Sequence, residues 1–182
     1  MANYRRVFIG GGRYFFTLVT ERRQRFLTEP PCLGALRSAL VTTRHDHPFR
    51  LDAIVVLRDH IHLLITLPAA DAEYPGRIKT LKARFTRALP MSVRDSLIKP
   101  GLSKTIKHEA GVWQRRYWEH TIRNEADYQH HLDYMMFNPV KHGLVCMVAD
   151  WRYSSFHRLV RKGMYPKDWG GTKGPNNFDA GE

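Results

Sequence analysis

Apolar residues follow two different periods in the first half of the chain, and each period predicts an element of secondary structure. Residues 13–20 are rich in aromatic and β-branched side chains and follow three glycines, which predicts a strand. Between residues 31 and 44 apolar positions recur at helical spacing, which predicts a helix. Two strand-like runs, 49–57 and 60–67, are separated by only two residues. That separation is typical of a β-hairpin.

A helix, a loop and another strand are expected next. Residues 76–89 carry apolar side chains along one side and basic side chains around the rest, which predicts an amphipathic helix. Residues 90–111 have no clear period and are expected to form a loop with short helical pieces. Residues 112–122 are dense in aromatic side chains, and we expect a strand there.

A third helix completes the pattern and defines the fold class. Asn124 can cap its start, and we expect it to end at about Phe137 because Pro139 follows. The resulting order is strand, helix, strand, strand, helix, strand, helix. This order predicts an α+β fold of ferredoxin-like (RRM-like) type, with an antiparallel sheet, helices on one face and a further helix that carries a candidate catalytic tyrosine.

Length and composition fit one folded domain. We expect residues 1–169 to form it, and residues 170–182, rich in Gly, Asn and Lys, to form a disordered tail. No apolar run approaches the roughly 20 residues of a membrane-spanning helix, so no membrane partner is expected. Cys32 and Cys146 form neither a disulfide framework nor a zinc cluster, which favours a reducing, cytoplasmic setting.

The charge balance is the unusual feature of the composition. The chain has 29 Lys and Arg against 17 Asp and Glu, a formal net charge of +12. Such a surface attracts polyanions, so nucleic acid is the favoured partner, although a basic protein without such a partner has the same composition. The sequence contains no P-loop, dinucleotide-binding glycine pattern or nucleophile-elbow serine, which excludes those chemistries.

A pair of histidines on the predicted strand 60–67 is the first candidate for chemistry. Side chains alternate along a strand, so His60 and His62 lie on one face and the intervening apolar residues on the other. Same-face neighbours are roughly 7 Å apart, close enough for two imidazoles to bind one metal ion. The alternative is chance, because ten histidines make such a pair unsurprising. A second pair, His45 and His47, precedes a proline in a polar segment, and we expect it to be solvated surface.

A tyrosine on the third helix is the second candidate. One face of this helix is apolar and is expected to be its core side: Tyr128, Leu132, Met135 and Met136. Tyr134 points roughly opposite that face and shares its side with Asp127, His131 and Asn138. A tyrosine placed in this way either packs between layers of the fold, which is common, or performs a chemical task.

These residues belong to a wider set of motifs. The strand Asp-His-Ile-His-Leu-Leu (59–64) is followed by Tyr134 and Asn138, as in single-tyrosine HUH transposases. More specifically, the chain resembles the REP-associated tyrosine transposases, whose genes lie near repetitive extragenic palindromes. The resemblance spans about residues 8–160, and its segments are Arg13-Tyr-Phe-Phe-Thr, Trp113-Gln-Arg-Arg-Tyr-Trp-Glu-His-Thr-Ile-Arg123, His131-Leu-Asp-Tyr-Met-Met-Phe-Asn-Pro-Val-Lys-His-Gly-Leu-Val145 and Asp150-Trp-Arg-Tyr-Ser-Ser155.

The resemblance implies roles for individual residues. The two histidine ligands of the family fall on His60 and His62, its nucleophile on Tyr134, and its third ligand on Asn138. One departure is visible, because the family usually has Tyr-Ile-His-Tyr-Asn where this chain has Tyr-Met-Met-Phe-Asn. The histidine replaced by Met136 lies on the expected core face, so we expect activity to survive.

The resemblance also implies a reaction and a partner. The expected reaction is cleavage of single-stranded DNA at REP-type hairpins through a 5′-phosphotyrosine intermediate. Mixed imidazole and amide ligation suits Mg²⁺ or Mn²⁺ as the cofactor. The monomer and the homodimer are both left open.

Basic and aromatic residues are candidates for DNA binding. We expect Lys82, Arg115, Arg116 and Lys141 to contact phosphates. Tryptophans 113 and 118 either stack on bases or belong to the core, and the basic side of the second helix is either a DNA contact or a solvated face. Two other functions are considered: a non-catalytic nucleic-acid binder on the same fold, and a metal-dependent nuclease that activates water.

Overall fold

The computed structural model describes residues 8–97 and 111–171, and it contains the predicted antiparallel sheet. The sheet has four strands in the order β2-β3-β1-β4, every neighbouring pair is antiparallel, and the connectivity is ferredoxin-like as predicted. The strands are β1 (Arg13–Val19), β2 (Arg50–Val56), β3 (His60–Thr66) and β4 (Trp118–Thr121).

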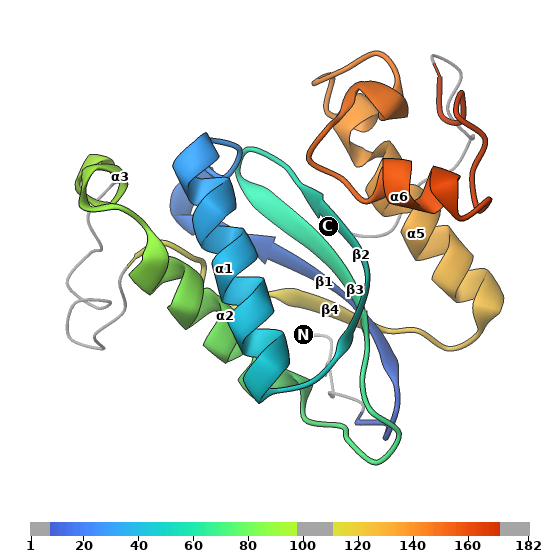
Figure 1. Cartoon of the computed structure of the whole chain (residues 1–182), viewed down its shortest axis with the longest axis horizontal. Helices are drawn as coiled ribbons and strands as arrows, with labels where there is room; N and C mark the ends of the chain where they lie inside the picture. Colours follow the sequence, from blue (N-terminus) through green and yellow to red (C-terminus); the bar gives the residue numbers. More distant parts are fainter. Residues whose placement is uncertain (1–7, 98–110, 172–182) are drawn as a thin grey trace, which may run out of the picture.

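Helices cover both faces of this sheet (Figure 1). On one face α1 and α2 lie side by side, and on the other lie α5 and α6. The sequence-based expectation of two helices on one face is therefore correct for α1 and α2, and the tyrosine helix, α5, forms part of a third layer. Within the described residues, none of the helices is long and apolar enough to span a membrane. The helices are α1 (Pro30–Asp46), α2 (Tyr74–Ala88), α3 (Met91–Ser96), α5 (Glu125–Lys141) and α6 (Phe156–Arg161), with short 3₁₀ turns at η1 (Glu21–Arg23) and η2 (Val148–Asp150).

Strand alternation explains why both faces have a core. On β1, Phe16 points toward α1 and α2, and its neighbour Phe15 points toward α5. On β3, Leu63 and Leu64 divide in the same way. Six of the seven residues of β3 are buried, so the histidine side of this strand is covered and not open to solvent.

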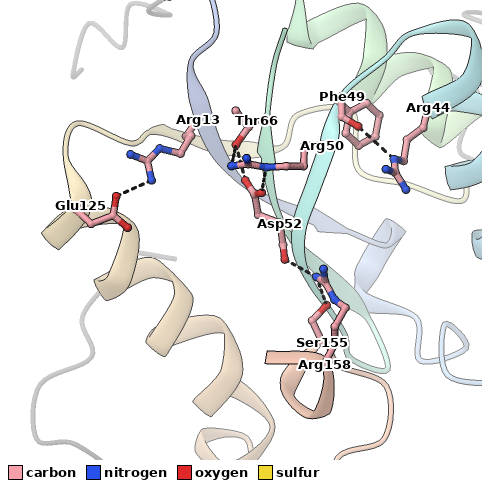
Figure 2. A network of polar contacts seen from close by, with 9 residues as sticks. All are labelled: Arg13, Arg44, Phe49, Arg50, Asp52, Thr66, Glu125, Ser155 and Arg158. Carbon is pink, nitrogen blue, oxygen red and sulfur yellow. Dashed lines mark hydrogen bonds and ion pairs between the residues drawn. The ribbon is translucent and has the colours of Figure 1, made fainter. Parts of the chain in front are cut away.

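Polar contacts hold the third layer against the sheet (Figure 2). Arg13, at the start of β1, donates a hydrogen bond to Glu125 at the start of α5, with a distance of 2.9 Å from Nη1 to Oε2. Arg158 of α6 donates to the backbone oxygen of Asp52 on β2 and to the hydroxyl of Ser155. These contacts position α5 and α6 relative to β1 and β2, the two strands that pair with the histidine strand β3.

Strand β4 is shorter than predicted. A strand was expected over residues 112–122, but β4 starts at Trp118, and Trp113 makes only an isolated bridge to Thr20. The register changes by two residues at this point, since Thr17 pairs with Trp118 but Thr20 is bridged to Trp113. The backbone between them leaves the regular pairing, and the Lys82 ammonium group donates to its oxygens at Gln114 (2.7 Å) and Arg115 (3.3 Å).

The predicted end of the third helix is wrong. Helix α5 continues through Pro139 to Lys141. Proline removes only one backbone donor, and the helical hydrogen bonds resume directly after it: the N–H of His142 donates to the Asn138 oxygen at 3.0 Å and that of Leu144 to the Pro139 oxygen at 2.9 Å. Asn138 therefore keeps helical geometry and stays on the same side of α5 as Tyr134.

The expectations for the remaining segments are tested only in part. Helix α3 is one of the short helical pieces expected in residues 90–111, and residues 98–110 lie outside the described chain. The predicted tail over 170–182 lies outside it from residue 172 onward. His45 and His47 are exposed as predicted, although His45 lies in the last turn of α1 and not in a loop.

Candidate active site

The two histidines of β3 lie beneath α5, next to its tyrosine. His60 and His62 have ring centroids 4.9 Å apart, and the Tyr134 ring is 5.4 Å from that of His62. All three side chains are almost fully buried, at 1%, 0% and 2% exposure. The fold therefore brings together the predicted ligand pair and the predicted nucleophile from segments more than 70 residues apart.

His60 is oriented by its neighbour. Its Nδ1 lies 2.7 Å from the Asp59 carboxylate, which can only accept a hydrogen bond, so Nδ1 is the donor in this contact and Nε2 is the ring nitrogen left available to a ligand. Burial alone raises the pKa of Asp59, but the His60 hydrogen bond and the Arg23 guanidinium outweigh it and hold this pKa at about 2. A carboxylate that orients a histidine in this way is typical of metal ligands.

His62 is neutral and is oriented by β1. Its Nδ1 lies 3.0 Å from the hydroxyl of Thr17, which directs Nε2 toward α5. Burial, followed by the proximity of His60, holds the pKa of His62 well below its usual range. Asn138 lies close enough to oppose this shift, yet its amide does not reach hydrogen-bonding geometry with the ring. A neutral imidazole is the form that binds metal.

Four buried polar atoms at this point have no hydrogen-bond partner within residues 8–97 and 111–171. They are Nε2 of His60, Nε2 of His62, and both amide atoms of Asn138. A buried polar atom without a partner destabilises a fold by about 1–3 kcal/mol, so such groups are uncommon unless they serve a purpose. Two imidazole nitrogens and an amide oxygen are a donor set that fits a divalent metal ion.

Tyr134 is oriented differently from the sequence-based expectation. It was placed on a side of α5 away from the core, but that side faces the sheet and is itself buried. Its ring contacts that of Phe15 on β1 (6.1 Å between centroids), and the Lys141 ammonium group lies 5.2 Å above the ring. Tyr134 and His131 share the side of α5 that faces the sheet, since both rings contact Phe15, and Asn138 lies against His62 on the same side.

A second group of polar side chains lies along the same helix. His120, Asp127 and His131 place their ligand-type atoms within 4.8 Å of one another. The Asp127 carboxylate accepts from His120 Nε2 at 2.8 Å and from the backbone N–H of Arg123 at 2.9 Å. His131, which shares the side of Tyr134, directs Nδ1 to the backbone oxygen of Asp127 at 2.9 Å. The two imidazole rings are stacked 4.2 Å apart and nearly parallel, which suits a hydrogen-bonded group better than two lone pairs converging on one ion.

A basic cleft leads to His60. Its volume is about 300 Å³, and its lining includes three arginines, Arg23, Arg25 and Arg58, together with His142. The ring of His142 lies 5.4 Å from that of His60. The sequence analysis missed these four residues. The basic run Glu-Arg-Arg-Gln-Arg (21–25) was the available signal, but only the fold shows that it adjoins the histidine strand.

The residues expected to bind DNA lie in different environments. Arg115, Arg116 and Lys141 are exposed, whereas Lys82 is half-buried against backbone oxygens of residues 114 and 115. Trp118 is half-buried and stacks on His120 at 5.9 Å. Trp113 is buried, so the core alternative holds for it, although it also lines a basic groove described below.

The fold and the site define a class of protein. A ferredoxin-like sheet with two strand histidines beneath a helix tyrosine is the arrangement expected of the single-tyrosine transposases. A family profile described as "Transposase IS200 like" matches residues 11–136, and the chain belongs to that family of DNA transposition enzymes.

Relatives that match over nearly the whole chain show which group of transposases within this family the protein resembles. The REP-associated tyrosine transposase of Escherichia coli (strain K12) is 41% identical over 183 residues, which cover 100% of this chain and 98% of the relative. A protein of Haemophilus influenzae, provisionally given the same name, is 49% identical over 173 residues, which cover 94% and 95%. The solved structure of a REP-associated tyrosine transposase bound to a REP hairpin has a TM-score of 0.79 and 40% identity, covering 100% of this chain and 98% of that one. The resemblance inferred from the motifs is thus confirmed.

Proposed function

We propose that this protein is a metal-dependent endonuclease and strand transferase that cuts single-stranded DNA at REP-type hairpins through a covalent bond to Tyr134. One observation carries the proposal. The unpaired atoms of His60, His62 and Asn138 lie next to the buried side chain of Tyr134, whose ring centroid is 5.4 Å from that of His62. A nuclease of this kind needs that pairing of a ligand set and a nucleophile.

The ligand set is proposed to bind Mg²⁺ or Mn²⁺. His60 and His62 would each contribute Nε2, and Asn138 would contribute its amide oxygen. When bound, such an ion polarises a non-bridging oxygen of the scissile phosphate and fixes its position. The hydrogen bonds of Asp59 and Thr17 orient the two imidazoles before binding, so little rearrangement is needed.

Tyr134 is proposed to attack the phosphorus atom of the scissile phosphate. A bond forms between the tyrosine oxygen and phosphorus, and the bond from phosphorus to the 3′ oxygen of the preceding nucleotide breaks. The tyrosine proton is released and the 3′ oxygen gains one, so the products are a 5′-phosphotyrosine and a free 3′-hydroxyl. Because the phosphodiester energy is stored in the new bond, rejoining needs no nucleotide cofactor.

The DNA is proposed to approach through the basic cleft. Arg23, Arg25 and Arg58 line it next to His60, where a phosphate would enter. Lys141, over the tyrosine ring, and the exposed Arg115 and Arg116 add positive charge around the site. Lys82 contributes by holding the 114–115 backbone in place. The REP hairpin bound by the related structure makes such hairpins the proposed partner.

The test is an adduct assay with labelled single-stranded hairpins taken from palindromes near the gene. Protein and DNA are incubated with Mg²⁺, with Mn²⁺ or with EDTA, and products are separated on denaturing gels. Tyr134→Phe and His60→Ala are run in parallel, with Tyr153→Phe as a matched control at a tyrosine outside the site. We expect a labelled protein band that requires metal, persists in the control and is lost in both site variants.

The two other candidate functions give different results in this assay. Cleavage that requires metal but survives Tyr134→Phe, without a protein band, would identify a nuclease that activates water. Tight binding of the hairpins without cleavage or adduct in either metal would identify a non-catalytic DNA-binding protein.

A further inference from the structure

A second basic groove lies on the opposite side of the sheet from the histidines. It is formed by α2, by residues near α3 and by the segment 111–117, and its volume is about 610 Å³. Pockets of roughly 300–1,000 Å³ are typical of small-ligand sites. We call it the α2 groove.

The groove combines many positive charges with an apolar floor. Its lining contains no aspartate or glutamate. Aromatic and aliphatic side chains form the floor: Val112, Trp113 and Tyr117. Five cations surround them, and all except the second are exposed: Lys79, Lys82, Arg87, Arg94 and Arg115. Cations around an aromatic floor match the phosphate and the base of a nucleotide.

Trp113 supplies a donor that the protein itself does not use. The side chain is 8% exposed and packs on Phe85, with ring centroids 5.1 Å apart. Its indole Nε1–H is buried and has no hydrogen-bond partner in the described part of the chain. Buried tryptophans usually find a partner for this group, so an unused donor in the wall of a groove points to a ligand that accepts a hydrogen bond.

The groove is directly connected to the histidine strand. Val19 pairs with His60, and the next residue, Thr20, is bridged to Trp113. The Thr20 hydroxyl and N–H both donate to the backbone oxygen of Asp59, at 2.9 and 2.8 Å. Trp113 is thus about two strand spacings, roughly 10 Å, from the backbone of His60. A few nucleotides of one DNA strand can span this separation around the end of the sheet.

We propose that the α2 groove binds an unpaired nucleotide of the DNA strand, with its base against Trp113 and Tyr117 and its phosphates on the surrounding cations. The Trp113 indole donates to an acceptor on the base. This inference rests on one part of the proposed function, namely that the protein binds DNA as its substrate. It adds a site for single-stranded DNA, separate from the metal site, that holds the strand while Tyr134 acts.

Equilibrium DNA binding measured in EDTA tests the assignment of the α2 groove, because EDTA removes divalent metal and so prevents cleavage. Fluorescence anisotropy compares a REP-type hairpin carrying an unpaired extension with the same hairpin without it. The groove variant is Arg87→Gln combined with Arg94→Gln, and the matched control is Arg161→Gln combined with Lys162→Gln, two exposed cations at the end of α6. We expect about tenfold weaker binding of the extended hairpin by the groove variant at 0.15 M salt, and a salt slope reduced by about 1.4, because two single-strand phosphate contacts are lost.

The hairpin without the extension should bind equally to the wild type and the groove variant. A second variant, Trp113→Phe, keeps an aromatic ring next to Phe85 but removes the indole donor together with part of the ring surface, and we expect about fivefold weaker binding of the extended hairpin. A photoreactive base in the extension should crosslink to the peptide that contains Trp113 and Tyr117.

Three results would overturn the inference. The first is equal affinity of the groove variant and the control for the extended hairpin. The second is an equal loss on both hairpins, which would reflect only general attraction to the basic surface. The third is competition: if a deoxynucleoside monophosphate added at millimolar concentration abolishes the crosslink between the DNA extension and the protein, the groove binds a free nucleotide. Intact groove-dependent binding without any adduct formation would refute the proposed nuclease and leave the groove assignment standing.

Discussion

The two faces of the sheet are made from the same strands but are buried in different ways. Toward α1 and α2, strand β3 presents Ile61, Leu63 and Ile65, which are fully packed in an apolar core. Toward α5, the same strand presents His60 and His62, which are equally buried but leave side-chain nitrogens unpaired. A shift of one residue along β3 thus separates side chains that stabilise the fold from side chains that destabilise it.

This difference shows that the α5 side of the sheet keeps buried polar atoms that lower the stability of the fold. An unpaired buried atom destabilises by about 1–3 kcal/mol, while a buried Leu or Ile stabilises by roughly 1.5–3 kcal/mol. The apolar face therefore maintains the structure, and the polar face keeps its ligand atoms available. Metal binding to that face should stabilise the protein, since a ligand that binds only the folded state raises its stability.

The largest expected effect concerns the polar face. His62→Leu should abolish metal-dependent adduct formation, because one of the three ligands is lost. The metal-free fold should change in stability by less than about 1 kcal/mol, since the variant removes one unpaired nitrogen but leaves the Thr17 hydroxyl without its partner. Denaturing gels and urea unfolding measure the two effects. An adduct formed at the wild-type rate would mean that His62 is not a ligand.

The matched change on the apolar face is Leu63→Ala. It should destabilise the protein by about 2–5 kcal/mol, because it leaves a cavity in a packed core. Urea unfolding without metal measures it, and any variant protein that remains folded should still form the adduct. A loss smaller than that of His62→Leu would contradict the assignment of the two faces.

The sequence could predict that His60 and His62 lie on the same side of β3. It could not predict that this side is buried under α5. Alternation along residues 60–67 places His60 and His62 on one side of the strand and Ile61, Leu63 and Ile65 on the other, so the common side of the two histidines follows from local geometry. That the same side lies beneath α5 depends on contacts between residues more than 70 positions apart, which local periodicity does not contain. For the same reason the side of α5 that carries Tyr134 was expected to lie away from the core although it faces the sheet, and Arg23 and Arg58 were missed.

The strand and helix boundaries failed where tertiary contacts override local preference. Alternation and helical period located β1, β2, β3, α1 and α2 to within about two residues. Pro139 was expected to end α5, but the helical hydrogen bonds resume directly after its missing donor. Strand β4 was predicted too long because the pairing with β1 shifts by two residues between the Thr17–Trp118 pair and the Thr20–Trp113 bridge, which local alternation does not reveal.

Asn138→Leu tests the third ligand. In the absence of metal the variant should be about 1 kcal/mol more stable than the wild type, since two unpaired buried atoms are replaced by an apolar side chain. Thermal unfolding with Mn²⁺ at about 100 times its dissociation constant should raise the stability of the wild type by about 2.7 kcal/mol and that of the variant much less. An equal metal-induced shift in both proteins would exclude Asn138 from the site.

The smallest expected effect lies at the edge of the polar face. Burial raises the pKa of Asp127, but hydrogen bonds from His120 and the Arg123 N–H lower it by more, so the net pKa is depressed. A depressed carboxyl pKa contributes stability above the unfolded value of about 3.9, and that contribution is lost as pH falls through the lower folded value. Asp127→Asn should therefore destabilise by about 0.5–1 kcal/mol at pH 6–7, with the difference declining as pH falls below the unfolded value of about 3.9. Urea unfolding at several pH values measures this, and a constant difference would contradict it.

The central claim is that Tyr134 becomes covalently bonded to DNA beside a metal held by His60, His62 and Asn138. The most direct test is peptide mass spectrometry of the adduct formed with Mn²⁺ and a REP-type hairpin, after digestion of both protein and DNA. The account predicts a nucleotide phosphate on the peptide that contains Tyr134, at that residue, and none when metal is omitted. A phosphotyrosine at Tyr128 or Tyr153, or cleaved DNA with a free 5′-phosphate and unmodified protein, would contradict it.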